Sequence, residues 1–316
     1  MQKRLDHGGG VDAAIARWGG TRDAWLDLST GINPVAYPVD DVSDLDWTAL
    51  PDTQAHTELI NAARAFWNVP EEADIVAASG ASALIAQMPT LFSGQRVHIP
   101  GPTYNEHAAA FQAAGWQVCG ASNAAIDLRV IVHPNNPDGR LWADTDAEID
   151  QIIIDESFAD ICPGRSLIAR TARPGAIVLK SFGKFWGLAG LRLGFAIGHP
   201  DTLSGLRNRL GPWAVSGPAY RIGAAALKDS DWARDTRIRL SEDSARLDAI
   251  MMRHGLRPLG GTTLFRLYDC PRARDVQARL AQSHIWSRVF PYAQTWLRLG
   301  LPAANDWDRL DAALRT

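Results

Sequence analysis

One lysine of the sequence lies in a setting where its amine could act as a nucleophile. Lys184 ends the motif Ser181-Phe182-Gly183-Lys184, which follows an apolar run at 176–179, and Arg192 stands eight residues further on. A lysine amine that is partly desolvated and close to another cation can have a pKa low enough to attack an aldehyde. An isolated lysine is far more often a solvated surface residue. The chemistry of Lys184 therefore depends on what the neighbouring segments supply.

Two other segments could bind charged groups at the ends of expected strands. Ser79-Gly80-Ala81-Ser82 follows one strand and opens a helix, so its backbone N–H groups could receive a phosphate. Ser79 or Ser82 could instead be an ordinary helix N-cap. Asp155 directly follows the apolar run 152–154, where a buried carboxylate needs a cationic partner. The alternative is that Asp155 caps the next turn.

Two turn-rich segments add further candidate loops. The first, His133-Pro134-Asn135-Asn136-Pro137-Asp138-Gly139, and the second, Gly101-Pro102-Thr103-Tyr104, both have the composition of turns. Composition alone does not distinguish either of them from an ordinary loop.

The elements that must position these residues follow an α/β pattern. From about residue 70, short runs rich in Ile, Val and Ala alternate with helical stretches, which predicts β-α units and a mostly parallel sheet. Ligands in such sheets collect at the carboxyl ends of the strands. A helix is expected at 57–67, where apolar residues recur with a spacing near 3.6. The expected strands are 74–78, 96–99, 128–132, 151–154, 176–179 and 194–197.

The sequence predicts two domains. A large domain should span 45–220, and a small α+β domain should combine 1–44 with 221–316. The chain becomes helical after Pro218, and the segment 263–268 is expected to be a strand of the small domain.

Composition argues against several classes of function. The chain has 316 residues with 46% hydrophobic content, a net charge of -3 and a pI near 6.2, and its charges are spread along the whole length. This balance gives no electrostatic reason to expect a nucleic acid or a membrane surface as partner. Cys119, Cys162 and Cys270 lack the spacing of a metal site or a disulfide framework. We therefore expect no bound metal. We also expect a cytoplasmic protein, because the cysteines suit a reducing compartment and no apolar run approaches the roughly 18 residues of a membrane span.

Taken together in their order along the chain, these motifs resemble the fold type I pyridoxal-phosphate (PLP) enzymes of the class I and II aminotransferase family. The resemblance implies that Lys184 carries PLP as a Schiff base and that Ser181 and Arg192 bind its phosphate. It also implies that Asp155 pairs with the ring nitrogen, that Asn136 donates to the 3'-oxygen and that Tyr104 stacks on the ring. The implied cofactor-binding residues are Gly80, Ala81, Ser82, Tyr104, Asn136, Asp155, Ser181, Lys184 and Arg192.

The opening of the chain resembles a narrower group within that family, the L-threonine-O-3-phosphate decarboxylases of cobalamin biosynthesis. The resemblance rests on Leu5-Asp6-His7-Gly8-Gly9-Gly10 and on Asp27-Leu28-Ser29-Thr30-Gly31-Ile32-Asn33-Pro34. In that group the His-Gly-Gly segment meets the substrate phosphate, with backbone N–H groups forming an anion nest. Arg298 would hold the substrate carboxylate, and Arg266 is a candidate ligand for either anion. The implied substrate-binding residues are His7, Gly8, Gly9, Gly31, Ile32, Asn136, Arg266 and Arg298.

The implied reaction is decarboxylation of L-threonine O-3-phosphate to (R)-1-aminopropan-2-ol O-phosphate and CO2, with Lys184, Asp155 and Tyr104 as catalytic residues. The resemblance also implies a homodimer. One alternative is histidinol-phosphate aminotransferase, or another enzyme of the class I and II family, which shares the fold and the cofactor. Another is a non-catalytic PLP-binding subunit in cobinamide assembly.

Two positions depart from the family pattern. Phe158 stands where many relatives have a tyrosine that hydrogen-bonds the 3'-oxygen, and Leu50 stands where a tyrosine often reaches across the dimer. The first change leaves the 3'-oxygen more dependent on Asn136. The second puts in doubt how a partner subunit contributes to the phosphate site.

Overall fold

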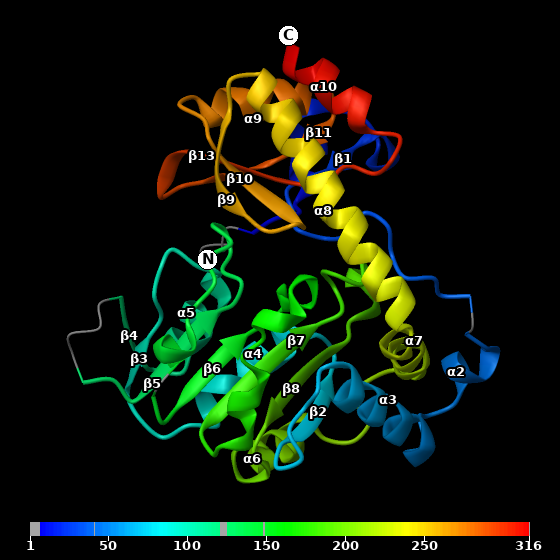
Figure 1. The fold of residues 1–316 in the computed structure, drawn as a ribbon, viewed down its shortest axis with the longest axis vertical. Coiled ribbons are helices and arrows are strands. Elements are labelled where there is room, and N and C mark those ends of the chain that lie inside the picture. The colour runs from blue at the N-terminus through cyan, green and yellow to red at the C-terminus, as the bar shows by residue number, and fades with distance from the viewer. Residues whose placement is uncertain (1–6, 41, 121–124, 148, 316) are drawn as a thin grey trace. The chain divides into compact units, whose positions relative to one another are not determined.

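The computed structural model describes residues 7–40, 42–120, 125–147 and 149–315 (Figure 1). The chain divides into two compact units. The large unit comprises Tyr37–Asn136 and Arg140–Arg234, and the small unit comprises Met1–Ala36, Pro137–Gly139 and Asp235–Thr316. Leu5 and Asp6 of the N-terminal motif lie outside the described residues.

A seven-stranded sheet is the centre of the large unit, with strand order β2-β8-β7-β6-β5-β3-β4. Strand β8 runs antiparallel to β2 and β7, and all other neighbours are parallel. Continuous apolar runs such as that of β6 are typical of strands covered on both faces, and every residue of β6 is buried. The strands are β2 (Asp74–Ala78), β3 (Arg96–His98), β4 (Gln117–Cys119), β5 (Leu128–Val132), β6 (Ile152–Asp155), β7 (Ala176–Ser181) and β8 (Gly194–Gly198).

Helices of the large unit pack on this sheet. An apolar cluster joins α4, α5 and α6 to the strands through residues such as Leu84, Phe111 and Leu203. Helices α3 and α7 lie side by side (Figure 1). The helices are α2 (Asp44–Thr48), α3 (Thr53–Phe66), α4 (Ala81–Gln87), α5 (Asn105–Ala113), α6 (Pro200–Leu210) and α7 (Gly217–Lys228).

The predicted α/β elements of the large unit are confirmed, with small shifts of their ends. The expected strands 74–78 and 128–132 match β2 and β5, whereas β7 continues two residues past the expected end because its pairing with β8 continues to Ser181. Helix α3 begins four residues before the expected start, since the Asp52 carboxylate accepts a hydrogen bond from the Ala55 N–H (2.8 Å) and caps the helix at that point.

The small unit contains two sheets and the helices that cover them. A four-stranded antiparallel sheet has the order β12-β13-β10-β9, and β1 pairs in parallel with β11. The predicted strand 263–268 corresponds to β10. The strands are β1 (Leu26–Asp27), β9 (Arg257–Gly261), β10 (Phe265–Asp269), β11 (Ile285–Trp286), β12 (Arg288–Phe290) and β13 (Ala293–Gly300). The helices are α1 (Val11–Trp18), α9 (Ala273–Gln282), α10 (Trp307–Arg315) and most of α8 (Ser230–Arg253).

The unit boundaries differ from the predicted 44/45 and 220/221. Tyr37 belongs to the large unit because its N–H donates to the Trp186 carbonyl (2.9 Å) and its ring packs on Trp186 and Trp232. Helix α7 stays with the large unit through its packing on α3. The short piece Pro137–Gly139 joins the small unit, where the Asp138 carbonyl accepts the Gly261 N–H (2.8 Å).

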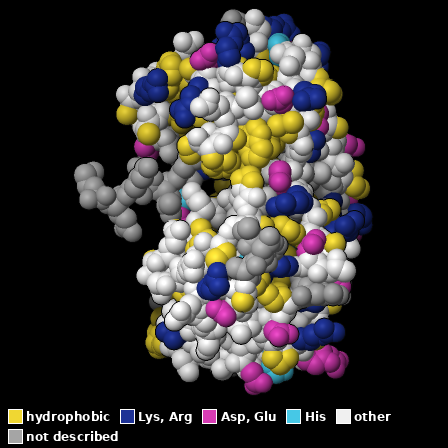
Figure 2. Space-filling model, turned by 90° about the vertical axis from the view of Figure 1, so that its left-hand side faces the viewer, with side chains coloured by type: hydrophobic (Ala, Val, Ile, Leu, Met, Phe, Trp, Pro, Cys, Tyr) yellow, Lys and Arg dark blue, Asp and Glu magenta, His cyan; other side chains and the backbone are white. Residues whose placement is uncertain are grey.

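Charged side chains of both signs are interspersed on the face shown in Figure 2, as the sequence predicts. Within the described ranges no helix is long and apolar enough to cross a membrane. The same residues contain no group of three His, Cys, Asp or Glu side chains placed to hold a metal ion.

Candidate active site

A pocket in the large unit lies at the strand ends where the sequence predicts the cofactor. The residues come from β5, β6, β7, helix α4 and the segments that follow β3, β5, β6 and β7. Of the nine predicted cofactor residues, all except Gly80 line the pocket, and Gly80 immediately precedes the lining residue Ala81. The lining residues are Ala81, Ser82, Ile85, Tyr104, Val132, Asn136, Asp155, Ser157, Phe158, Ser181, Gly183, Lys184, Ala189 and Arg192.

One end of the pocket is built to receive an anion. Gly80 is the N-cap of α4 with φ 88°, and no side chain caps this helix end. The Ser79 hydroxyl donates instead to the Ala214 carbonyl (2.6 Å), so the N-cap alternative for Ser79 is wrong. A Cβ on Gly80 would lie 2.6 Å from Arg192 Nη2, so glycine is required for the guanidinium to approach the helix end. Helix N–H groups, Ser181 and Arg192 form a set suited to a phosphate.

Asp155 provides the negative charge of the pocket. It is only 2% exposed, and its carboxylate accepts hydrogen bonds from His107 Nε2 (2.8 Å), the Ser157 N–H (2.9 Å) and the Ser157 hydroxyl (2.5 Å). Burial alone would raise the pKa of Asp155, but the bonds from His107 and Ser157 outweigh it and hold the pKa below the usual range. Asp155 therefore caps the next turn and also presents a carboxylate to the pocket, so both sequence interpretations apply.

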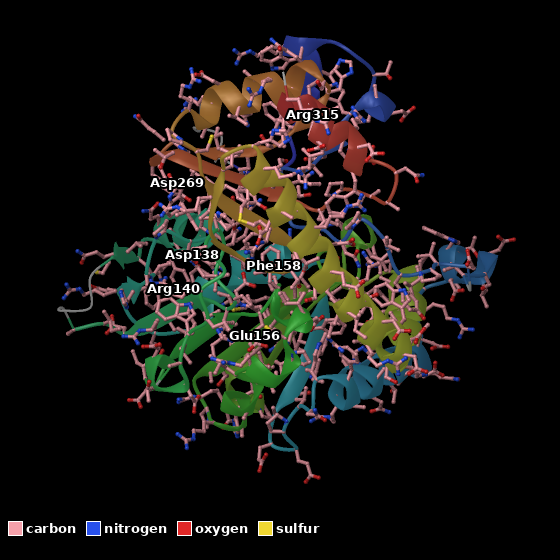
Figure 3. All side chains as sticks on the ribbon, turned by 45° about the horizontal axis from the view of Figure 1, so that its top comes forward. Asp138, Arg140, Glu156, Phe158, Asp269 and Arg315 are labelled. Carbon is pink, nitrogen blue, oxygen red and sulfur yellow. The ribbon has the colours of Figure 1, made fainter. Side chains whose placement is uncertain are left out.

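Lys184 supplies the amine of the pocket. Among the lysines that the structure describes, it alone lines this cavity. Its Nζ lies 5.4 Å from the centre of the Phe158 ring, which is buried and offers no hydroxyl. Phe158 and Glu156, both labelled in Figure 3, belong to the segment that follows β6.

Two residues that the sequence interpretation missed hold the pocket in shape. His107 lies in the first turn of α5, three residues after Tyr104, and orients Asp155. Asn135 is fully buried; it accepts from the Thr103 hydroxyl (2.6 Å) and donates to the Pro102 carbonyl (3.0 Å). The two turn-rich segments of the sequence are therefore tied together. The position of His107 three residues after Tyr104 is the available sequence signal, because residues with this spacing lie on one side of a helix start.

The predicted substrate-binding residues lie in the small unit, apart from Asn136. Arg298 on β13 is 4% exposed, and its Nη2 donates to the Ser29 carbonyl (2.6 Å). The Gly9 N–H donates to the Ser29 hydroxyl (2.6 Å). The glycine segment, residues 8–10, and Arg298 therefore both contact Ser29. Gly31 and Ile32 come two and three residues after Ser29, and His7 is exposed at the start of the described chain. The structure thus brings together N-terminal and C-terminal residues that the sequence analysis assigned to one substrate.

Arg288 is a further cation that the sequence interpretation missed. Its Cα pairs with that of Arg298 across β12 and β13, so the two side chains lie on one face of the sheet. Like charges placed directly opposite destabilise a sheet, and an anionic ligand would remove that cost. The short strand β12 was not predicted, and without its register Arg288 could not be associated with Arg298.

Arg266 has a different environment from the one expected of a substrate ligand. Its Nε and Nη2 donate to the two carboxylate oxygens of Asp248 (3.0 and 2.7 Å), and the Tyr268 hydroxyl donates to the same carboxylate (2.8 Å). This guanidinium is held in an ion pair within the small unit, which assigns it a structural role.

Comparison with known proteins identifies the class. Residues 41–316 match the family of class I and II aminotransferases, and the chain belongs to this family. This confirms the resemblance and the fold class inferred from the sequence.

Individual relatives narrow the comparison. The chain is 40% identical to a threonine-phosphate decarboxylase of Sinorhizobium sp, over 100% of this chain and 99% of the relative. It is 38% identical to a threonine-phosphate decarboxylase of Pseudomonas aeruginosa, over 98% and 97% of the two chains. The fold matches histidinol-phosphate aminotransferase from Sinorhizobium meliloti in complex with pyridoxal-5'-phosphate, with a TM-score of 0.83, 21% identity and coverage of 98% and 94%.

Proposed function

We propose that this protein uses PLP to decarboxylate L-threonine O-3-phosphate, releasing CO2 and (R)-1-aminopropan-2-ol O-phosphate. In the overall reaction the Cα–carboxylate bond breaks and a proton takes the place of the carboxylate at Cα. The full-length similarity to two proteins named threonine-phosphate decarboxylase supports this substrate. A role in cobalamin biosynthesis is part of the proposal, since it is the pathway implied by the sequence resemblance.

The observation that carries the proposal is the two-part anion site of the small unit. Threonine phosphate has two anionic groups, a carboxylate and a phosphate ester. Arg298 offers a buried guanidinium, and guanidinium groups bind carboxylates through paired hydrogen bonds. The segment His7–Gly9 offers the His7 imidazole and the Gly8 N–H for the phosphate, while the Gly9 N–H donates to the Ser29 hydroxyl and holds the segment in place. Arg288 adds a second cation beside Arg298, which suits a ligand of more than one negative charge.

The pocket of the large unit fits PLP. When bound, PLP withdraws electrons from the substrate Cα through its protonated ring. Asp155 stays ionised and can hold the proton on the ring nitrogen, because its lowered pKa resists protonation. The start of α4 with Ser181 and Arg192 would hold the cofactor phosphate, and Tyr104 offers an aromatic face. These groups differ from the anion ligands of the small unit, so cofactor and substrate phosphates have separate ligands.

Lys184 is the group that would move the proton. Its amine is in the pocket beside Phe158 and is the amine that can bind the cofactor aldehyde. The Lys184 Nζ would deliver the proton that replaces the carboxylate at Cα after CO2 has left. Phe158 cannot donate to the 3'-oxygen, which leaves Asn136 as the proposed donor.

We also propose a cytoplasmic homodimer. Three exposed apolar residues of the large unit support an interface, with Leu45 at 69%, Trp47 at 71% and Leu50 at 67% exposure. Leu45 and Leu50 line one groove together with Tyr220 and Arg221. Light scattering of the eluting protein should give twice the 34.4 kDa chain mass. A Leu50→Glu variant should shift toward the monomer mass. A mass of 34.4 kDa for the wild type as well as for the variant would contradict the dimer.

The activity is tested by incubating PLP-loaded protein with L-threonine O-3-phosphate, with and without 2-oxoglutarate. The proposal predicts CO2 and aminopropanol phosphate in equal amounts, independent of 2-oxoglutarate. Glutamate formed from histidinol phosphate and 2-oxoglutarate would instead identify an aminotransferase. Cofactor binding at Lys184 without turnover of either substrate would support a non-catalytic role.

A further inference from the structure

Ser29 of the small unit is at the centre of a directed chain of hydrogen bonds. Its side chain and backbone are buried. Its N–H (2.9 Å) and its hydroxyl (2.6 Å) both donate to one carboxylate oxygen of Asp27. A hydroxyl has a single proton, so the Ser29 oxygen that donates to Asp27 is free to accept, and it accepts the Gly9 N–H at 2.6 Å. Asp27 therefore fixes the orientation in which Ser29 can bind Gly9.

The peptide unit of Gly9 is also held from its carbonyl side. Trp286 Nε1 donates to the Gly9 carbonyl (2.9 Å). Trp286 is the direct cross-strand partner of Asp27 in the two-stranded pair of β1 and β11. Next to Gly9, a Cβ on Gly8 would lie 2.5 Å from the Ser29 carbonyl oxygen, so the segment lies directly on Ser29. Ser29 thus binds the Gly9 N–H, and Trp286 of β11 binds the Gly9 carbonyl.

The same elements position the two arginines. The Ser29 carbonyl accepts from Arg298 Nη2, and the Gly300 N–H at the end of β13 donates to the Leu28 carbonyl (2.7 Å). Trp286 is separated by one residue from Arg288, the cross-strand partner of Arg298. Ser29 therefore contacts the glycine segment through its hydroxyl and Arg298 through its backbone carbonyl.

We propose that Ser29, oriented by Asp27, is a positioning residue that determines selectivity for amino acids carrying both a carboxylate and a phosphate. It holds the Gly9 peptide, and with it the phosphate-binding segment, at a fixed place relative to Arg298. The inference rests on the proposed function, because it takes the glycine segment as the phosphate ligand. Its two contacts can be separated experimentally, since an alanine side chain removes the hydroxyl and leaves the backbone carbonyl for Arg298.

The test compares L-threonine O-3-phosphate with L-threonine as ligands of PLP-loaded Ser29→Ala protein. Dissociation constants come from the absorbance change of the bound cofactor, and KM and kcat come from CO2 release. Loss of one hydrogen bond should weaken binding of the phosphorylated ligand by roughly threefold to tenfold. Binding of L-threonine should stay within about twofold, because its carboxylate needs only Arg298. The kcat for the phosphorylated substrate should fall less than its KM rises.

Ser287→Ala is the matched control. Ser287 is an equally buried serine of the small unit, and its hydroxyl has no hydrogen-bond partner among the described residues. This control should keep the wild-type ratio of the two dissociation constants. Trp286→Phe removes the donor to the Gly9 carbonyl. Like Ser29→Ala, it should lower the ratio of the dissociation constant of L-threonine to that of L-threonine O-3-phosphate. This variant provides a second test if Ser29→Ala folds poorly.

Hydrogen exchange separates this inference from the proposed function. The Gly9 amide should be protected in the wild type and in Ser287→Ala, and it should exchange faster in Ser29→Ala. Faster exchange with an unchanged ratio of dissociation constants, or an equal loss for both ligands, would refute the role in selectivity. An unchanged exchange rate of the Gly9 amide in Ser29→Ala would show that the Ser29 hydroxyl does not hold this amide. A wild type without CO2 release from threonine phosphate would overturn the proposed function, whatever the exchange result.

Discussion

Removal of the buried Lys180 charge should strongly destabilise the large unit. Lys180 is 2% exposed, and its Nζ lies 2.6 Å from Glu156 Oε2 and 3.7 Å from Asp160 Oδ1. Lys180→Met retains most of the side-chain volume but leaves two buried carboxylates without their cation. Breaking a buried pair from one side costs about 3–5 kcal/mol of unfolding free energy. Lys180→Met with Glu156→Gln should recover part of that loss, since one of the two buried charges is then removed.

The assay is urea unfolding at neutral pH with saturating PLP, followed by tryptophan fluorescence. Trp67 and Trp186 are suitable reporters, because their Nε1 groups donate to Asp160 (2.8 and 3.1 Å) within this cluster. Lys228→Met is the control: Lys228 is exposed at the end of α7, so its replacement should change stability by less than about 0.5 kcal/mol. A loss below about 1 kcal/mol for Lys180→Met would refute the reasoning.

The pH dependence of the same difference has a definite sign. Burial lowers the pKa of Lys180, but Glu156 and Asp160 outweigh burial and hold it above its usual value. A raised folded-state pKa contributes stability that is fully present below the unfolded pKa of about 10.4 and is lost as the pH rises through the folded value. The difference in unfolding free energy between wild type and Lys180→Met should therefore be constant from neutral pH to about pH 9.

Two substitutions test the cofactor pocket, and one labelling experiment tests the buried thiol of Cys162. Lys184→Ala should lower CO2 release at least about a hundredfold with little effect on unfolding, because it removes the proposed proton donor from a half-buried site; residual activity near wild type would contradict that role. His107→Phe should make PLP retention sensitive to weak acid, because only the two Ser157 bonds then oppose the effect of burial, which raises the pKa of Asp155. In the wild type that pKa is lowered, and its contribution is lost only as the pH falls below the unfolded value near 3.9. Dialysis across a pH series followed by cofactor absorbance measures this, and identical pH profiles would contradict it. Burial raises the pKa of Cys162 to about 11, so iodoacetamide should label this thiol roughly a hundredfold more slowly at pH 8 than an ordinary cysteine, as followed by mass spectrometry; equal rates would show that the thiol is accessible and ionised.

The cofactor pocket could be predicted because each part follows its own strand. Asp155 ends an unbroken apolar strand, and Ser181 ends another in the neighbouring position of the sheet. Parallel strands bring their carboxyl ends to one edge, so residues far apart in sequence meet there without any further information. Local pattern thus indicated the segments of Lys184, Asp155 and Ser79–Ser82, whereas Tyr104 and Asn136 were expected only from the family resemblance.

The residues that were missed depend on register or on distant partners. Arg288 became a neighbour of Arg298 only through the pairing of β12 with β13. Ser29 and Arg298 are 269 positions apart, and no local pattern indicates their contact. The ion pair of Arg266 could not be predicted for the same reason, since its partner Asp248 lies on a helix and the sequence gives no sign of the contact.

The proposed function assigns cofactor binding to the large unit and most of the substrate ligands to the small unit. Asp155 and Lys184 lie at the ends of strands of a buried sheet, so their replacement should affect the binding of the cofactor. The proposed ligands of the substrate anions are a different set, in which Ser29 joins the glycine segment to Arg298 by one side-chain bond and one backbone bond. For this protein, the buried Arg298 and its link to the glycine segment favour a substrate whose carboxylate and phosphate are close together, as they are in threonine phosphate.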